Sequence, residues 1–501
     1  MKVLLIDPPG SDMGLNVGLG YLAASLQETG NEVCVLDLNN QSTAGYWGAA
    51  IYRPSPQELR NIVTEFIQRR FQPDLVGISV KSFTSQVSAR IILTVRALNP
   101  SIKILVGGPH ITLFGVDYVK ETGADVGFIG ESEYVIAQVC TALARQQELT
   151  DIKGIILNHG SETSITSPPA AIIDLDKLSF PDYRHFTSTK NNGGKIDDYF
   201  LLTSRGCPYS CTFCSVGQIM GKKWRKRSPQ NVINELLMAH ENYDIKHFNI
   251  IDDNFTLDMN RAKEICELII SSKINLNWGC PNGVFAARLD EELVKLMKRA
   301  GCTRVFIGIE SVDEKVLKST KKRETLQDIE NAIRMCHDVG IEVQGFFIIG
   351  LPCSTLQSDL KSVEFAKKNK IDGWWNMLTP YPGTEVLYWV NANATTLGDF
   401  QTGHYVSQSH TPRVVFETQD YTASERTQAF YMIHLRMNHF GWLVSKESIR
   451  LGKILRLLYY SLRYAPLTFP SIVWFLITWI PRKIPRSLAR TLFRRMDHCL
   501  A

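Results

Sequence analysis

The chain has 501 residues, more than one hydrophobic core usually holds, so two or three domains are expected. Hydrophobic residues make up 44% and charged residues 21%, which excludes a disordered, collagen-like or coiled-coil protein. The net charge of +5 is uneven: from Lys446 onward eleven basic and two acidic residues give +9, which leaves −4 elsewhere. A nucleic-acid partner is therefore not expected.

Eleven cysteines, an odd number in a long chain, do not suggest a secreted disulfide framework. The apolar run after Met1 is short and ends at Asp7 and two prolines, so no signal peptide is expected. We therefore expect a cytoplasmic protein, in which clustered thiols indicate metal ligands or catalysts.

Residues 1–150 alternate short β-branched runs with helical patterns. The expected strands are 3–7, 33–38, 75–80, 102–107 and 126–129. The expected helices are 20–28, 56–70, 85–98 and 131–146. Near-continuous Val, Ile and Leu runs separated by helices are typical of a parallel sheet covered on both faces. We predict an α/β fold that begins with a doubly wound, Rossmann-like domain, with ligands at the carboxyl ends of its strands.

A polar, proline-bearing stretch over residues 151–195 predicts a small hairpin and a linker. A second alternating series fills residues 196–398, and its expected strands are 200–204, 247–251, 276–280, 304–308, 343–349 and 373–377. Six such units without a seventh or eighth predict a partial (β/α)6 barrel. The chemistry of such barrels lies at the carboxyl ends of the strands.

Residues 399–501 are expected to form a helical, basic C-terminal region. Within it, residues 465–481 carry no charge but include Pro466 and Pro470 in the interior, and arginines and aromatic residues flank them. This length is at the bottom of the range for a membrane span. The pattern favours peripheral contact with the inner face of a membrane. A true span and an internally packed helix are the alternatives.

Cys207, Cys211 and Cys214 form a C-x3-C-x2-C motif directly after a predicted strand. Three thiolates within one loop can surround one metal centre, and thiolates favour zinc or an iron–sulfur cluster. A structural zinc site usually has four protein ligands, and no paired fourth ligand lies nearby in the sequence. Three ligands on a four-iron cluster leave one iron open for an external molecule. The spacing therefore favours a cluster over zinc.

This motif, at the end of the first strand of a six-unit barrel, resembles the radical S-adenosylmethionine (SAM) enzymes. The resemblance covers about residues 200–384 and includes segments 250–256, 308–311, 345–352 and 380–384 at strand ends. It implies that the three cysteines hold a 4Fe-4S cluster whose fourth iron binds SAM. It also implies SAM contacts from Phe213, Asp252, Asp253, Glu310, Ser311, Ile348 and Gly350.

The resemblance gives these residues roles. Phe213 and the backbone around Ile348 and Gly350 would meet the adenine, and Glu310, with Ser311 beside it, would accept the ribose hydroxyls. An acid in the pair Asp252-Asp253 would meet the amino group of SAM. The pair departs from the Gly-Gly-Glu that is commoner in the family, so the resemblance does not choose between the two acids. The other cysteines are expected to be buried, with Cys280 and Cys353 near the site.

Two interpretations of the first domain compete. Gly18-Leu-Gly20 matches the dinucleotide pattern loosely, but these glycines do not directly follow the first strand, so NAD is not favoured. Segments 7–10, 18–26, 79–84, 107–110 and 130–133 resemble the cobalamin-binding domain that precedes the barrel in one radical SAM subgroup. The implied cobalamin contacts are Pro9, Gly18, Gly20, Ser82, Thr84, Gly107, Gly108, His110, Gly130 and Glu131.

The first domain departs from the best-known cobalamin pattern, Asp-x-His-x-x-Gly after strand one, because it has no histidine there. Cobalt would then lack a protein imidazole. His110 is the only nearby candidate, and a loop residue or a contact to the nucleotide tail is the simpler interpretation. An inherited domain that binds a ligand other than cobalamin, or has lost its ligand, is the alternative.

The resemblance implies reductive cleavage of SAM and modification of an unactivated carbon in a hydrophobic, lipid-like or tetrapyrrole substrate. We expect a C-methyltransferase, with an oxidative cyclase of the anaerobic magnesium-protoporphyrin type as the second possibility. An electron donor such as flavodoxin or ferredoxin is the expected protein partner. A non-catalytic scaffold stabilised by a metal is the alternative from another class.

Overall fold

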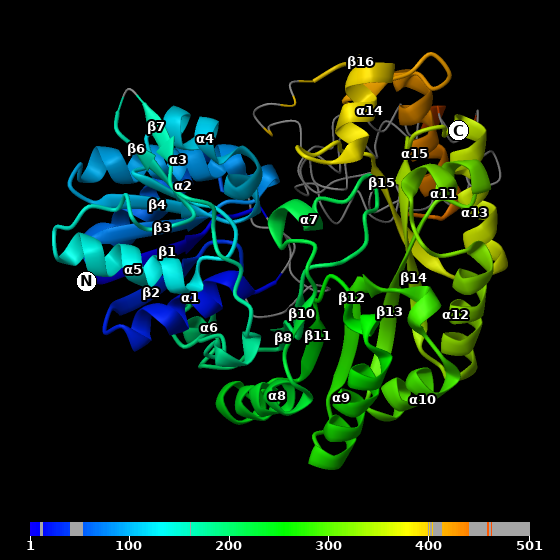
Figure 1. Ribbon diagram of the computed structural model, residues 1–501, viewed down its shortest axis with the longest axis horizontal. Helices are drawn as coiled ribbons and strands as arrows, with labels where there is room; N and C mark the ends of the chain where they lie inside the picture. The colour runs from blue at the N-terminus through cyan, green and yellow to red at the C-terminus, as the bar shows by residue number, and fades with distance from the viewer. Residues whose placement is uncertain are drawn as a thin grey trace, which may run out of the picture.

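The computed structural model describes residues 1–10, 14–40, 54–160, 162–398, 400, 403, 413–439, 458–459 and 462. Two mainly parallel sheets lie side by side, one from the blue and cyan part of the chain and one from the green and yellow part (Figure 1). Both belong to α/β units, as the sequence predicts.

The first sheet has seven strands. In spatial order they are β2 (Glu32–Asp37), β1 (Lys2–Asp7), β3 (Leu75–Ser79), β4 (Lys103–Gly107), β5 (Val126–Phe128), β6 (Ile155–Asn158) and β7 (Thr163–Ile165). The first five run parallel in a doubly wound order, which confirms the prediction. The hairpin expected after this domain extends the sheet, because β6 pairs antiparallel with β5.

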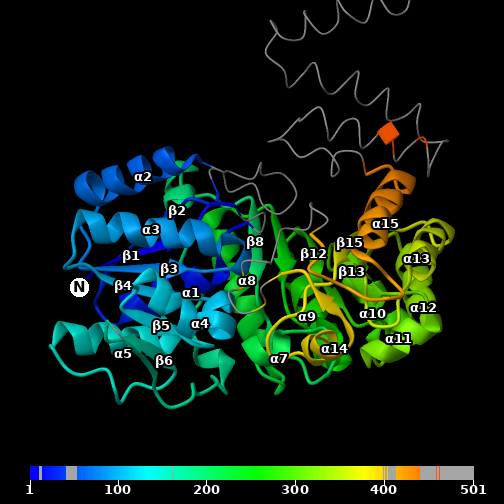
Figure 2. The same cartoon turned by 90° about the horizontal axis from the view of Figure 1, so that it is seen from above.

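Helices cover both faces of this sheet (Figure 2). They are α1 (Val17–Glu28), α2 (Pro56–Glu65), α3 (Ser85–Leu98), α4 (Pro109–Thr122) and α5 (Glu133–Ala144), with short turns η1 (Phe66–Arg70) and η2 (Ser82–Thr84). Alternate strand residues point to opposite faces, so Leu5 packs with α1 and α5 and Leu4 with α2 and α3. The sequence analysis missed α4, which starts at Pro109 after Gly108 in the left-handed region at φ +103°.

The second sheet is an open barrel of six parallel strands. In spatial order they are β15 (Asp372–Met377), β14 (Glu342–Ile349), β13 (Cys302–Glu310), β12 (Asn277–Val284), β11 (His247–Ile250) and β8 (Asp198–Leu201). The order ends at β8 and β15 without joining them, as the prediction of a partial barrel requires. β12 and β13 run past their expected ends, so Cys280 and Glu310 lie within strands.

Helices pack outside the barrel, and shorter elements complete the chain. The helices are α8 (Pro229–Tyr243), α9 (Met259–Ser272), α10 (Glu291–Arg299), α11 (Glu314–Thr320), α12 (Leu326–Asp338), α13 (Leu356–Lys368) and α15 (Ala423–Arg436). The shorter elements are η3 (Leu175–Lys177), α6 (Thr187–Asn191), β9 (Ser204–Arg205), α7 (Val216–Ile219), β10 (Arg225–Lys226), η4 (Phe255–Leu257), η5 (Ala286–Arg288), α14 (Glu385–Asn393), β16 (Thr395–Thr396) and β17 (Phe416–Glu417).

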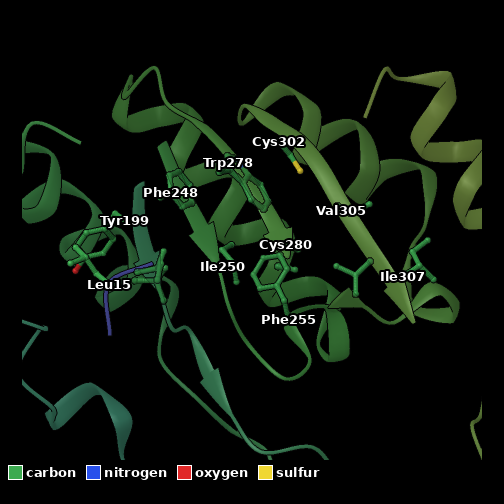
Figure 3. Close-up of a cluster of buried hydrophobic side chains, with 14 of the residues drawn as sticks. Leu15, Tyr199, Phe248, Ile250, Phe255, Trp278, Cys280, Cys302, Val305 and Ile307 are labelled. Atoms are coloured by element: carbon green, nitrogen blue, oxygen red, sulfur yellow. The ribbon is translucent and has the colours of Figure 1, made fainter. Parts of the chain in front are cut away.

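The outer faces of the barrel strands form an aromatic and aliphatic core (Figure 3). The rings of Phe248 and Trp278 stack 5.7 Å apart, and Phe255 meets Trp278 edge-on at 6.2 Å. Trp278 also donates its indole N–H to the Ala300 carbonyl at 2.9 Å. This packing fixes the strands, so their alternate residues face the barrel interior.

Four buried charges join the two sheets. From β9, Arg205 donates to Glu131 Oε1 at 2.8 Å and to Glu133 Oε1 at 2.6 Å. From β10, Arg225 donates to Glu131 Oε2 at 2.5 Å, and the Arg205 guanidinium lies 5.2 Å from the ring centre of Tyr21. Burial alone would raise the pKa of Glu131, but the two arginines hold it below its ordinary value. We call these four residues the junction lattice.

A second buried network holds the segment around α15 against the barrel. Asp359 Oδ2 accepts from the Gly350 amide and from the Tyr421 hydroxyl, each at 2.9 Å. Arg426 donates to the Gly350 carbonyl at 3.1 Å and lies 4.2 Å from the ring centre of Phe416. The carboxyl end of β14 is therefore fixed by residues more than sixty positions later in the chain.

Within the described ranges, no helix is both long enough and apolar enough to cross a membrane. The described part of the C-terminal region is helical at α15, as expected. The apolar segment 465–481, for which membrane contact was predicted, lies outside the described residues.

The junction lattice generates a stability prediction. Glu131→Gln removes the charge shared by Arg205 and Arg225, so we expect a loss of about 3–5 kcal/mol in unfolding free energy, typical of a broken buried pair. Denaturant unfolding of the full chain, followed by circular dichroism, measures it. In the matched control, Asp244→Asn, the pair with Lys195 is 63% and 59% exposed, so solvent screens it and we expect little change in stability. Equal losses in the two variants would contradict the assignment.

The network around Asp359 generates a pH prediction. Burial raises the pKa of Asp359 to about 7. An acid with a raised folded-state pKa keeps its proton on folding, so its ionisation opposes folding and stability falls as pH rises from about 4 to about 7. Asp359→Asn, which mimics the protonated acid, should reduce this fall by about 1–3 kcal/mol. Unfolding free energies at several pH values measure the difference, and parallel pH profiles would refute it.

Candidate active site

The three motif cysteines lie on the loop between β9 and α7, at the carboxyl rim of the barrel. The loop begins at Gly206, whose φ of +82° is in the left-handed region and whose Cβ would lie 2.8 Å from the Gly221 carbonyl oxygen, so glycine is required. Cys207, Cys211 and Cys214 are partly exposed. The sequence therefore places three thiols on one accessible loop.

Backbone hydrogen bonds fix this loop on the rim. The Cys214 amide donates to the Cys211 carbonyl at 3.1 Å, and the Thr212 amide donates to the Thr320 carbonyl at 3.0 Å. The Val386 amide at the start of α14 donates to the Thr212 carbonyl at 2.9 Å. Two barrel helices thus hold the centre of the cysteine loop.

The thiols are close enough to affect one another. Burial raises the pKa of Cys211 to about 12 and that of Cys214 to about 11, and the charge of Cys207 adds to both shifts. Among the described residues, no three His, Cys, Asp or Glu side chains are gathered to hold a single metal ion. Three thiolates presented by one loop are the ligand type that iron–sulfur clusters take.

The two adjacent acids after β11 are placed differently. Asp252 is 1% exposed and accepts hydrogen bonds from the Thr203 amide at 2.6 Å and the Ser204 hydroxyl at 2.6 Å. Asp253 lines the large cavity described below, where it accepts from the Gly206 amide at 3.1 Å. Burial raises the pKa of Asp253 to about 6. Asp252 thus orders the chain before the cysteine loop, and Asp253 faces open space.

Glu310 occupies the rim end of β13 in a constrained conformation. Its φ is +63°, and the strand register shifts between Gly308 and Glu310. Lys322 Nζ lies 3.5 Å from Glu310 Oε1 and 2.9 Å from Glu324 Oε2. Burial raises the pKa of Glu310, and the Lys322 charge opposes this shift. The next residue, Ser311, is buried, and its hydroxyl accepts from the Asp313 amide at 3.2 Å.

Phe213 and Ile348 belong to one apolar cluster at the rim. Leu113 and Phe114 of α4 join the same cluster, so the first domain contributes to this side of the rim. Gly350 has a φ of +88°, and a Cβ there would lie 2.2 Å from Arg426 Nη1, so a side chain is excluded.

A cavity of about 430 Å³ lies between the two sheets. Its apolar floor follows one face of the first sheet, from Leu5 through Gly77 and Leu105 to Phe128, beneath α1 and α5. Its far wall comes from the barrel and includes Phe200, Arg205, Met220, Asp253 and Asn282. The cavity therefore connects the carboxyl edge of the first sheet with the rim that carries the cysteines.

Half of the residues implied for cobalamin line this cavity, and half do not. The lining residues are Gly18, Gly107, Gly108, Gly130 and Glu131. Glu131 is engaged in the junction lattice as well. The residues outside the lining are Pro9, Gly20, Ser82, Thr84 and His110. A Cβ at Gly20 would lie 2.9 Å from Pro181, so Gly20 serves the packing of the linker.

The Ser82, Thr84 and His110 side chains serve the first domain itself. The Thr84 hydroxyl donates to the Lys81 carbonyl at 3.1 Å, and Ser82 Oγ lies 3.1 Å from His110 Nδ1. His110 is fully buried between the rings of Phe114 and Tyr118, each 5.0 Å away. His110 therefore lies in helix α4, packed inside the first domain, and not in a loop as the sequence analysis suggested.

Several cavity and rim residues were not anticipated. Asn16 and Lys81 line the cavity, and Asn16 Nδ2 donates to Asp7 Oδ1 at 2.8 Å. Arg205 directly precedes Gly206 and the first cysteine, which is the one sequence signal that could have singled it out. Of the two further cysteines near the site, Cys280 is buried in the outer core (Figure 3) and Cys353 is exposed.

Comparison with protein families agrees with this two-part site. The family model of the Radical SAM superfamily matches residues 201–366. The family model of the B12 binding domain matches residues 10–140. An uncharacterized methyltransferase of Pyrococcus horikoshii is 30% identical over 78% of this chain and 84% of its own. The cytidylyl-2-hydroxyethylphosphonate methyltransferase of Streptomyces wedmorensis is 30% identical over 70% and 73%.

An anaerobic magnesium-protoporphyrin IX monomethyl ester cyclase of Rubrivivax gelatinosus is 26% identical over 81% of this chain and 73% of its own. Among solved structures, the radical SAM methyltransferase TsrM from Kitasatospora setae aligns with a TM-score of 0.66 and 19% identity, over 79% of this chain and 78% of its own. That likeness supports the fold. The chain belongs to the radical SAM superfamily, as an enzyme whose B12-binding domain precedes its radical SAM domain.

Proposed function

We propose that this enzyme methylates an unactivated carbon of a small-molecule substrate in a radical reaction that uses both SAM and cobalamin. The observation that carries the proposal is the cavity between the sheets. Its wall combines glycines at the carboxyl edge of the first sheet with Arg205 and Asp253 at the rim that carries the cysteines. A group held by the first domain would face the same space as a group held by the cysteine loop.

The loop thiols of Cys207, Cys211 and Cys214 fit a 4Fe-4S cluster in ligand type and accessibility. When bound, the cluster, SAM and cobalamin supply one-electron and methyl-transfer chemistry that no side chain provides. The task of the protein is then to hold these groups, to orient the substrate and to exclude water.

The rim residues support a division of work around SAM. Asp253 is favoured over Asp252 for the amino group, because Asp252 is already engaged by Thr203 and Ser204. Glu310, fixed by Lys322, would accept the ribose hydroxyls, with Ser311 beside it. Phe213 and Ile348 would pack against the adenine, whose edge would meet the backbone at Gly350.

The glycines of the cavity support cobalamin as the ligand of the first domain. Gly107, Gly108 and Gly130 leave the strand ends uncovered, so backbone can lie against a bulky ligand. The apolar floor beneath α1 and α5 would receive the nucleotide tail, since ligand sites are mostly apolar with few polar groups.

The cluster proposal predicts that removing a motif thiol lowers iron content and SAM cleavage, whereas removing a thiol outside the motif does not. Cys211→Ala should reduce iron after anaerobic reconstitution and lower 5′-deoxyadenosine formation from SAM by at least about 100-fold, because the cluster loses a ligand. Iron analysis and mass spectrometry with dithionite as the reductant measure both. Cys353→Ala, at an exposed cysteine on the same rim, should behave like the wild type. An iron-poor wild type with intact thiols would refute the proposal.

The same experiment with isotopically labelled SAM and candidate extracts separates two reaction types. A product in which one hydrogen is replaced by a labelled methyl group supports methyl transfer. The cyclase relative makes oxidative ring formation the second candidate, and a product that loses hydrogen without gaining carbon would favour it. Either reaction needs an external reductant, for which flavodoxin or ferredoxin is our proposal.

The cavity predicts where cobalamin binding can be blocked. Gly107 has an ordinary φ, and a Cβ there would meet Phe128 at 3.5 Å, so Gly107→Val should fold and fill part of the cavity. We expect cobalamin affinity to fall by at least about tenfold, since the added methyl groups displace ligand atoms. Equilibrium dialysis with hydroxocobalamin measures it, while iron content stays unchanged. The exposed control Ala97→Val should bind normally, and unaltered binding by Gly107→Val would count against this site.

A further inference from the structure

The interior wall of the barrel carries aromatic and amide side chains that none of the proposed cofactor contacts uses. Val305, Phe347 and Trp375 lie in the core under the outer helices. Their strand neighbours therefore point inward. These inward residues are Phe306 on β13, Gln344 and Phe346 on β14, and Trp374 and Asn376 on β15. We call these five residues the interior wall.

Strand pairing makes this wall continuous. Phe306 is paired with Gln344, and Phe346 with Trp374. One pair further toward the rim, Asn376 lies beside Ile348, which belongs to the proposed SAM site. The interior wall therefore begins next to the proposed SAM site, on the side away from the rim.

The aromatic part of the wall offers a ring face. Phe306 and Phe346 stack with ring centres 4.8 Å apart, and Trp374 meets Phe306 edge-on at 6.4 Å. Phe346 and Trp374 are only partly buried. A flat ring can stack on such a surface in the offset or edge-on geometry that aromatic pairs prefer.

The two amide side chains of the interior wall differ in their hydrogen bonding. Gln344 accepts from the Trp374 indole N–H at 3.3 Å and donates to Glu342 at 2.9 Å, so it is engaged. The Asn376 Oδ1 atom is buried and, within the described structure, has no hydrogen-bond partner. A buried acceptor without a donor destabilises the protein. A ligand N–H or O–H next to Asn376 would supply this donor.

The wall carries no charge among its five residues. Further from the rim, charged side chains have partners: Arg304 is paired with Glu342 at 2.7 Å, and His439 Nε2 lies 2.7 Å from Asp372 Oδ1. An ionised group pressed against the wall would lose its hydration without gaining a partner, which is costly. The part of the substrate that enters here is therefore expected to be uncharged.

We propose that the substrate presents to the interior wall an uncharged aromatic ring that carries an N–H or O–H donor. The ring lies against Phe346 and Trp374, and its donor reaches Asn376 Oδ1. This inference rests on the proposed function, because it names the substrate class of that site. A purely aliphatic lipid would leave Asn376 without a donor, so the wall narrows the range that the sequence suggested.

Four small probes separate the elements of this proposal on the reconstituted full-length protein. Phenol has the ring and the donor, anisole lacks the donor, cyclohexanol lacks the flat ring, and benzoate adds a charge. Saturation-transfer NMR titrations should show phenol binding at least about fivefold more tightly than each of the others, the effect of one hydrogen bond or one stacking contact. Equal affinity for anisole or for cyclohexanol, or no binding of phenol, would overturn the proposal.

Variants locate the binding. Asn376→Leu should abolish the preference for phenol over anisole, and Phe346→Ala should weaken both probes alike. Asn234→Leu, at an exposed position of α8, is the matched control and should leave all affinities unchanged. If Asn376→Leu does not fold, Asn376→Ala provides the same comparison. A preference for phenol that persists in the Asn376 variant would refute the assignment.

Failure of this inference is distinguishable from failure of the proposed function. Formation of 5′-deoxyadenosine from SAM tests the proposed function and needs no probe. A wild type that cleaves SAM but does not discriminate among the probes would overturn only the substrate class.

Discussion

The two halves of this enzyme depend on one electrostatic constraint, the junction lattice. Arg205 and Arg225 stand on the short strands that bracket the cysteine loop, while Glu131 and Glu133 follow β5 of the first sheet. None of these charges could be buried alone, because an unpaired buried ion is costly. The first domain and the cysteine loop must therefore dock together, and that docking closes the cavity in which their cofactors would meet.

Glycines at the strand ends determine much of the remaining shape of the site. Gly206 permits the turn that starts the cysteine loop, and Gly350 permits the close approach of Arg426 behind the rim. In the first sheet, Gly107 leaves room for a ligand where a side chain would fill it, and Gly108 permits close packing on the Val80 backbone. Asp253 is a polar group in the wall of this largely apolar cavity, as is usual for a pocket that binds organic cofactors, while Glu310 lies at the rim beside Lys322.

Both sheets could be predicted from the sequence, and so could the grouping of three cysteines on one loop. Hydrophobic periodicity and the spacing of ligand residues are local signals. The sequence could not choose between Asp252 and Asp253: at the end of a strand, the direction of two adjacent side chains is set by their neighbours, here Thr203 and Ser204. It also could not separate the buried Arg205 from exposed basic residues, since burial of a charge depends on partners far away in the chain. For the same reason, glycines that line the cavity and those that pack the linker, such as Gly20, look alike in sequence.

The backbone at Glu310 has a consequence for how a ligand would be received. A residue other than glycine rarely adopts a φ of +63°, and here the strand irregularity at Gly308 and the contact with Lys322 maintain it. The carboxylate is thus oriented before any partner arrives. The entropy of ordering it is lost during folding rather than at the encounter, so a nucleoside could be captured without a slow local rearrangement.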